Sequence, residues 1–323
     1  GYKGDVPDGY FVVQPRTYGV WIFLRGSIAQ GLDAAVKTFE DKLRVYPLSR
    51  KDDPPKTEFV SGSAKSFNTI SPNDYGVYED LNQLVQEEPL EALDAERRGQ
   101  LAAIGIVKGQ PFNPDARMKT LLTEAVAIGN ATARAIVWYP RVDGAKIYPD
   151  TDSAWVMAFA NKDVFFLRDG GRNLDARTMF YYAYTAVTPA MAVSRPGLGS
   201  DYGIAYLDSK KQPLDGAKTY RLRLPPNVPV NNFWAVTLYD SQTRSMLQTS
   251  QPFPTIGSQS DGFKQDKDGS SDVYFGPKAP EGKEDNWLET IPGKSWFIIL
   301  RMYGPLQAWI DKTWRPGEIE LVE

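Results

Sequence analysis

The chain has 323 residues, of which 42% are hydrophobic and 24% are charged, so it is long enough for two ordinary globular domains. Its 37 Lys and Arg against 40 Asp and Glu give a formal net charge of −3, which does not favour nucleic acid as a partner. Cys and His are absent, which excludes disulfides, zinc–thiolate sites, histidine-based metal sites and the Ser-His-Asp triad. No metal or cofactor is therefore expected, and no stretch approaches the roughly 20 apolar residues of a membrane span.

Residues 1–72 read as part of a β-domain followed by a linker. Strands are expected at 9–14 and 18–26, a helix at 32–43, and a charged, proline-containing linker at 49–58. Two strands followed at once by a helix do not complete a sheet. We therefore expect a segment of the precursor upstream of Gly1 to complete it.

Residues 73–135 are predicted to be helical. Apolar residues recur at helical spacing in 78–85, 92–104 and 116–135, and Gly105 is placed to end the second of these helices. The segment is interpreted as a helical insert covering a sheet edge, and the alternative is a lid over a ligand.

Residues 136–323 are predicted to form a β-sandwich. The run 231–240 and its counterpart 295–305 alternate with apolar residues on both sides, so each is expected to be buried on both faces and to need a second sheet. Further expected strands are 135–140, 154–159, 164–167, 202–208, 220–224 and 319–322, and 180–193 reads as a helix or an extended segment. Trp314 is expected to plug the core beside the last strand, which is predicted to lie at a sheet edge with Glu318 and Glu320 outward.

Several blocks in order carry a family resemblance: DGYFVVQPRTYGVWIFLRG, LDGAKTYRLRLP, FWAVTLYD, DGSSDVYFGP, NWLETIPGKSWFIILRMYGP and TWRPGEIELV. They resemble a two-domain bacterial family built from domains of unknown function 1254 and 1214. The resemblance covers about residues 195–322 for the second domain and only the tail of the first. It implies two jelly-roll-like β-sandwich domains with a helical segment between them, the first incomplete here. It also implies a periplasmic or secreted protein, and no settled activity.

Arg301 lies inside an otherwise bulky, apolar run. A buried Arg needs a carboxylate or several carbonyl partners, and Asp240 at the end of the companion strand is the natural candidate. One interpretation is an Arg–Asp brace across the sandwich. The other is an Arg directed at a bound anion or carboxylate.

Aromatic residues of the same region could form a platform for a sugar ring or another planar ligand, or could simply fill the core. The candidate ligand-binding residues, taken with Arg301 and Asp240, are Trp234, Tyr239, Asn286, Trp287 and Tyr303.

Two loops have compositions that are also found in ligand-binding loops. Residues 266–272 resemble part of a calcium loop, but a strand rather than a helix follows, which favours a solvated hairpin. Residues 194–202 are Gly-rich but lack the spacing and the βαβ context of a phosphate-binding loop.

Two functions remain open. The first is a module that binds a small polar ligand or glycan, or assembles as a homo-oligomer. The second is a histidine-free hydrolase or lyase that uses Asp or Glu with Tyr and Arg301 at a cleft between the domains. Two carboxylates about 5–10 Å apart in a cleft would favour glycosidase-like chemistry, whereas aromatic residues with one Arg would favour binding.

Overall fold

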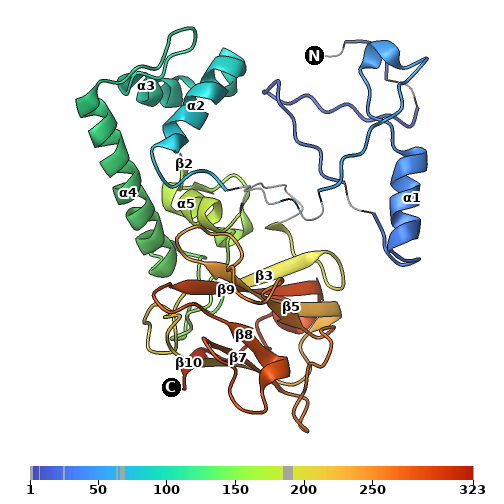
Figure 1. Cartoon of the computed structure of the whole chain (residues 1–323), viewed down its shortest axis with the longest axis vertical. Coiled ribbons are helices and arrows are strands. Elements are labelled where there is room, and N and C mark those ends of the chain that lie inside the picture. The colour runs from blue at the N-terminus through green and yellow to red at the C-terminus, as the bar shows by residue number, and fades with distance from the viewer. Residues whose placement is uncertain are drawn as a thin grey trace. The chain divides into compact units, whose positions relative to one another are not determined.

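The computed structural model describes residues 3–6, 8–24, 26–62, 65, 70–184 and 192–322. The chain divides into two compact units. Unit 1 comprises Gly1–Phe67 and Gly76–Met118, and unit 2 comprises Asn68–Tyr75 and Lys119–Glu323. The described residues are mainly β-structure and connecting segments with several helices (Figure 1).

The helices of unit 1 follow the apolar spacing of the sequence. They are α1 (Leu32–Lys42), α2 (Gly76–Glu87) and α3 (Ala95–Ala103), with short 3₁₀ turns at Leu48–Arg50 and Leu90–Ala92. Asp94 caps α3 because its side chain accepts a hydrogen bond from the Arg97 N–H at 2.8 Å. Gly105 follows α3 with φ of 91°, as its predicted role at a helix end requires.

The strands predicted at 9–14 and 18–26 are wrong, because the described residues of both segments have no assigned strand. Both are extended segments whose side chains are largely exposed, including Phe11 at 95% and Trp21 at 68%. A β-strand is stable only when its backbone pairs with a neighbour, and side-chain propensity alone does not supply that pairing.

The segment 135–167 departs from its prediction. The expected strand at 135–140 is instead the end of α4 (Ala116–Trp138), whose Val137 packs into a buried cluster. At 154–159 only Val156 forms β-bridges, to Lys146 and Ile204. At 164–167 only Leu167 lies in a strand, the two-residue β1 (Leu167–Arg168), which pairs with β2 (Gly171–Arg172). Here packing outweighs the β-preference of Ile, Val and Trp.

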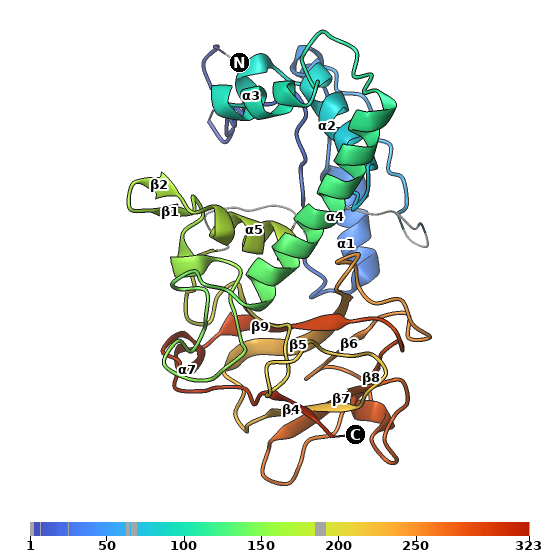
Figure 2. The same cartoon turned by 90° about the vertical axis from the view of Figure 1, so that its left-hand side faces the viewer.

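Two four-stranded sheets form the sandwich of unit 2. Their strand orders are β3-β9-β5-β6 and β10-β4-β7-β8. The strands are β3 (Ser200–Ala205), β4 (Tyr220–Leu224), β5 (Val230–Asp240), β6 (Thr255–Gly257), β7 (Ser271–Gly276), β8 (Trp287–Glu289), β9 (Trp296–Pro305) and β10 (Ile319–Leu321). Figure 2 shows the two sheets as stacked layers. The predicted sandwich is confirmed, and β6 and β8 are strands that the pattern did not reveal.

The central strands β5 and β9 bury both of their faces, as predicted. They pair antiparallel, with Trp234 opposite Met302 and Val236 opposite Leu300. These four side chains face the other sheet and belong to the core between the sheets. Alternate residues such as Phe297 and Ile299 face outward, because successive side chains of a strand point to opposite faces.

A second layer covers the outward face of the β3-β9-β5 sheet. It includes the end of α4, α5 (Leu174–Ala183) and the loop around Val156, which pack on Phe297, Ile299 and Ile204 in a second buried cluster. Asn173 caps α5 by accepting from the Ala176 N–H at 3.1 Å. Part of the segment 180–193 is thus helical, and residues 185–191 lie outside the described residues. The polar side chains discussed below lie between this layer and the sheet.

The C-terminal strand is confirmed at the edge of the second sheet. Ile319 pairs with Leu222 of β4 and is buried, and Trp314 is 9% exposed within the core. Exposed Glu320 pairs with Arg221 at 2.7 Å. Glu318 does not point outward as predicted, because its carboxylate accepts hydrogen bonds from Ser153 Oγ and the Ala154 N–H, both at 2.8 Å.

The loop that resembled a calcium site surrounds an arginine instead. Arg223 of β4 lies within 3.1–3.3 Å of carboxylate oxygens of Asp266, Asp268 and Asp272. The guanidinium thus supplies the positive charge that these carboxylates require. Within the described residues no cluster of three or more Asp or Glu is arranged to hold a metal ion.

Candidate functional site

Three of the seven predicted site residues meet on the outward face of the first sheet. Arg301 of β9 donates hydrogen bonds to the hydroxyl oxygens of Tyr239 on β5 and Tyr303 on β9, the latter at 3.5 Å. Tyr202 of β3 pairs with Arg301 across the strands, so its side chain shares this face. Stacking of Tyr303 on Phe233 and of Tyr239 on Phe297 fixes both phenols beside the guanidinium.

Arg301 is largely buried among neutral groups. Burial raises the pKa of Tyr239 above its ordinary value even though Arg301 opposes the shift, so this phenol is uncharged near pH 7. Burial also works against the charge of Arg301, but the phenol oxygens outweigh it and the pKa of Arg301 lies above its ordinary value. Arg301 Nε is buried without a hydrogen-bond partner. A permanent charge on β9 is therefore stabilised beneath the second layer by the dipoles of phenol groups rather than by an opposite charge.

The predicted brace between Arg301 and Asp240 is wrong. In the register of β5 and β9, Asp240 lies opposite Trp296, whereas Arg301 lies opposite Ala235. The two positions are five residues apart along β5, about 17 Å at the usual rise of a strand, and they have opposite parity. Asp240 instead bonds Lys294 Nζ at 2.7 Å and accepts from the N–H groups of Gln242 and Thr243.

Asp240 gives a pH-dependent prediction. Burial alone would raise the pKa of this carboxyl, but the bonds from Lys294 and the two backbone N–H groups outweigh it and hold the pKa below its ordinary value. A lowered folded-state pKa stabilises the fold above the unfolded-state value, and this contribution is lost as the pH falls through the folded-state value. Asp240→Asn is expected to lower the free energy of unfolding by about 2 kcal/mol near pH 7. The gap from the parent should close as the pH falls below the ordinary pKa of an Asp side chain, about 4.

Urea unfolding of the parent and of Asp240→Asn across this pH range measures the gap directly. A difference that stays constant with pH would show that Asp240 acts through its shape and not through its charge.

The remaining predicted site residues serve the fold. Trp234 is 2% exposed in the core between the sheets. Buried Asn286 donates to the carbonyls of Lys264 and Asp272 and accepts from the Lys264 N–H, so it holds two loops together. Trp287 donates its indole N–H to the Gly276 carbonyl at 2.9 Å. The aromatic platform predicted from these residues is therefore not assembled as one surface.

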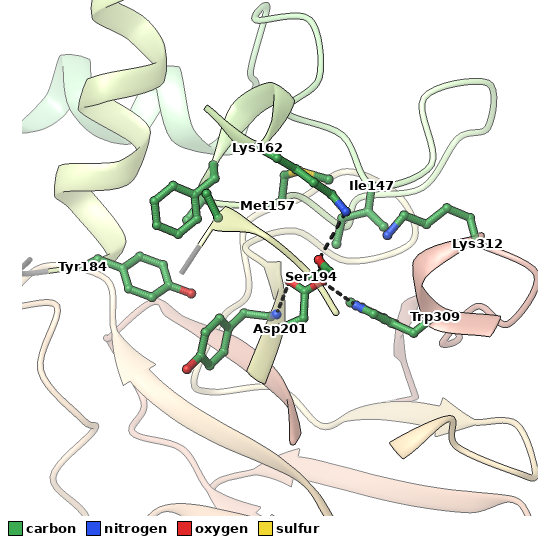
Figure 3. A pocket seen from close by; sticks show the side chains of 12 residues that line it. Ile147, Met157, Lys162, Tyr184, Ser194, Asp201, Trp309 and Lys312 are labelled. Atoms are coloured by element: carbon green, nitrogen blue, oxygen red, sulfur yellow. Dashed lines mark hydrogen bonds between the residues drawn. The ribbon is translucent and has the colours of Figure 1, made fainter. Parts of the chain in front are cut away.

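A small cavity lies over β3, and Tyr202, which shares the face of Arg301, is one of the residues that line it. It has a volume of about 20 Å³ and is lined by Lys162, Tyr184, Ser194, Asp201, Tyr202, Trp309 and Lys312 with apolar Ile147, Met157, Ala158, Phe159 and Ala192. Figure 3 shows the polar side chains converging from β3, from the short helix α7 (Gln307–Ile310) and from the segments that contain Lys162 and Ser194. The volume is enough for about one water molecule.

Asp201 is the single carboxylate among the residues that line this cavity. It accepts hydrogen bonds from Ser194 Oγ at 2.6 Å, Trp309 Nε1 at 3.0 Å and its neighbour's amide, Tyr202 N–H, at 2.9 Å. Lys162 Nζ donates to Ser194 Oγ at 3.2 Å. The carboxylate thus uses three of its roughly four acceptor sites to hold a serine, a tryptophan and the strand in place.

The residues of this cavity were missed by the sequence analysis except as part of other features. Ser194 and Asp201 belong to the Gly-rich loop, whose spacing does not fit a phosphate-binding loop, and Lys162 and Lys312 belong to no motif. The sequence signal that could indicate such residues is an isolated polar residue within an apolar stretch. Their convergence depends on tertiary structure.

Unit 2 is therefore a two-sheet β-sandwich with a helical layer over one sheet and a polar site beneath that layer. Residues 199–307 match the model of a family described as "Protein of unknown function (DUF1214)", which supports the resemblance for this part of the chain. The expected match of the N-terminal part is not shown by this comparison. No curated protein matches the chain.

Two solved structures are similar to the chain. The VPA0106 protein of Vibrio parahaemolyticus is 19% identical with a TM-score of 0.37, and the match covers 84% of this chain and 59% of that one. A putative uncharacterized protein of Burkholderia cenocepacia is 13% identical with a TM-score of 0.30, over 76% of this chain and 50% of that one. The chain thus spans less than two thirds of either protein. No helix among the described residues is both long and apolar enough to cross a membrane.

Proposed function

We propose that unit 2 binds a small polar ligand that carries a carboxylate or a similar anionic group, with Arg301 as its principal contact. The observation that carries the proposal is the environment of Arg301, whose hydrogen bonds go to phenol oxygens of Tyr239 and Tyr303. A guanidinium presents a planar fork of N–H donors that matches a carboxylate, and an anion would complete the charge balance that neutral phenols leave open.

Aromatic side chains and one Arg favour binding over hydrolysis. The glycosidase-like alternative requires two carboxylates on opposite sides of a substrate bond. The cavity over β3 has Asp201 alone, and its oxygens are already occupied by three donors. The alternative function as a hydrolase or lyase therefore receives no support from the described residues at this site.

Matched pairs of acid and neutral probes test the proposal. Benzoate and glucuronate are expected to raise the melting temperature of the protein, whereas benzamide and glucose are not. A ligand at about 100 times its dissociation constant stabilises the folded state by about 2.7 kcal/mol. Equal shifts from the acids and from their neutral counterparts would contradict the proposal.

Variants at Arg301 separate binding from folding. Arg301→Met is expected to melt close to the parent, because an apolar side chain of similar length removes a buried charge without leaving an unpaired carboxylate. It should lose the stabilisation by benzoate. Arg301→Lys should retain part of it, since it keeps the charge but not the fork. If Arg301→Met still responds to the acids as the parent does, the anion binds elsewhere.

A further inference from the structure

Two lysine side chains face each other on the solvent side of the cavity over β3. Lys162 ends the 3₁₀ turn Ala160–Lys162, and Lys312 follows α7. Figure 3 shows the two amines directed towards one another near Ser194, although the segments that carry them are far apart in the sequence. Lys162 is exposed and Lys312 is half-buried, so solvent reaches this pair of ammonium groups.

The charges around this pair leave an excess of positive charge. Asp201 is the single carboxylate that lines the cavity, and three neutral O–H and N–H donors already bond to it. Burial lowers the pKa of Lys312, Asp201 acts against this shift, and the ammonium of Lys162 adds to it. Two facing cations that share one carboxylate have a net positive charge, which favours an anion as a third partner.

Both ammonium groups have hydrogen-bond donors to spare. An ammonium has three N–H donors, and Lys162 uses one of them on Ser194 Oγ at 3.2 Å. Lys312 Nζ has no hydrogen-bond partner among the described residues. It lies 5.0 Å from the centre of the Trp309 ring, and this cation–π contact stabilises the charged form. Trp309 is 1% exposed and its indole N–H bonds Asp201, so the support beneath the ammonium is rigid.

We propose that Lys162 and Lys312 bind a phosphate group between their ammonium groups, either as the free ion or as an ester of a small molecule. A phosphate group presents oxygens in several directions, so it accepts hydrogen bonds from two separate point charges. A carboxylate has two coplanar oxygens, which suit the planar fork of an arginine. The anion lies outside the cavity, because a volume of about 20 Å³ has room for about one water molecule. The site is independent of anion binding at Arg301, which belongs to a different group of side chains.

The backbone conformation of the two lysines determines the best variants. Both are left-handed, with φ of 56° for Lys162 and 65° for Lys312. Asn adopts this conformation more readily than most residues, so Lys162→Asn and Lys312→Asn remove each charge without new backbone strain. Lys211 has φ of 61° and does not line the cavity, so Lys211→Asn is the matched control for the loss of one positive charge.

Calorimetric titration with inorganic phosphate at constant ionic strength tests the proposal on the whole protein. The parent is expected to bind phosphate with a Kd of about 1 mM or lower. Lys162→Asn and Lys312→Asn should each weaken binding about tenfold or more, because each removes hydrogen bonds between charged groups. Lys211→Asn should bind phosphate as the parent does. The melting temperature of each variant shows whether it is folded.

Glycerol phosphate and glycerol separate the two sources of the phosphate group. Binding of glycerol phosphate and not of glycerol would support an ester as ligand, and binding of inorganic phosphate alone would support the free ion. Absence of phosphate binding by the parent, or equal binding by the parent, Lys162→Asn and Lys312→Asn, would overturn the proposal. Loss of phosphate binding in Arg301→Met, with binding retained in Lys312→Asn, would place the anion at Arg301 and overturn it as well.

Discussion

Truncation of the chain before Trp314 is expected to abolish the folded sandwich of unit 2. Trp314 is 9% exposed in the core between the sheets and donates its indole N–H to the Pro226 carbonyl at 3.2 Å. Loss of a buried Trp typically costs about 3–5 kcal/mol. Loss of β10 also exposes the edge of β4, including the backbone of Leu222 that pairs with Ile319.

The tail is bonded to a second region that the truncation would release. Tyr148 donates its hydroxyl to the Trp314 carbonyl at 3.2 Å, and Trp155 donates its indole N–H to the Gly317 carbonyl at 2.9 Å. Both donors are buried, so each would be left unsatisfied at a cost of about 1–3 kcal/mol. Together these losses approach the whole net stability of a domain, about 5–15 kcal/mol.

Solubility and circular dichroism of the truncated protein measure the outcome, which should be aggregation or loss of fixed tertiary packing. Removal of Val322 and Glu323 alone is the control, because it keeps β10 and Trp314 and should melt close to the parent. A soluble truncated protein that melts like the parent would show that the tail is not part of the fold.

The sandwich could be predicted because its strands alternate strictly. In β4 the side chains of Tyr220, Leu222 and Leu224 are buried and those of Arg221 and Arg223 are not, so the sequence alone defines its two faces. The long runs of β5 and β9 likewise required a covering layer on each side. Here local pattern and tertiary structure agree.

The predictions that failed depended on which segments pair as strands and in which register, and a single sequence does not show this. The apolar segment at 18–24 has the composition of a strand, yet no ladder forms in the described residues. Arg301 and Asp240 have complementary charges, but only the register of β5 against β9 shows that they lie on opposite faces. The side chains of the cavity over β3 come from segments far apart in sequence, so their convergence has no local signature.

Gly216→Ala is expected to lower the free energy of unfolding by about 3 kcal/mol, because the added Cβ overpacks the site and the backbone must move to accommodate it. Gly216 lies in the turn before β4, where its N–H bonds the Lys294 carbonyl at 2.9 Å and its carbonyl accepts from Thr290 Oγ1 at 2.8 Å. A Cβ at this position would lie 2.1 Å from the Ile291 carbonyl oxygen. Both neighbouring segments are fixed by these bonds, so relief of the clash must break them.

Gly129→Ala is the matched control and should change the free energy of unfolding in the opposite direction. Gly129 lies in α4 with no atom within 4 Å of an added Cβ, and it is exposed. Alanine restricts the unfolded chain and favours a helix, so Gly129→Ala is expected to stabilise the protein by about 0.5–1 kcal/mol. Urea unfolding of both variants measures the contrast. If Gly216→Ala unfolds at the parent's midpoint, the turn has room for a side chain, and the close approach of Gly216 to the segment before β9 is not a requirement of the sandwich.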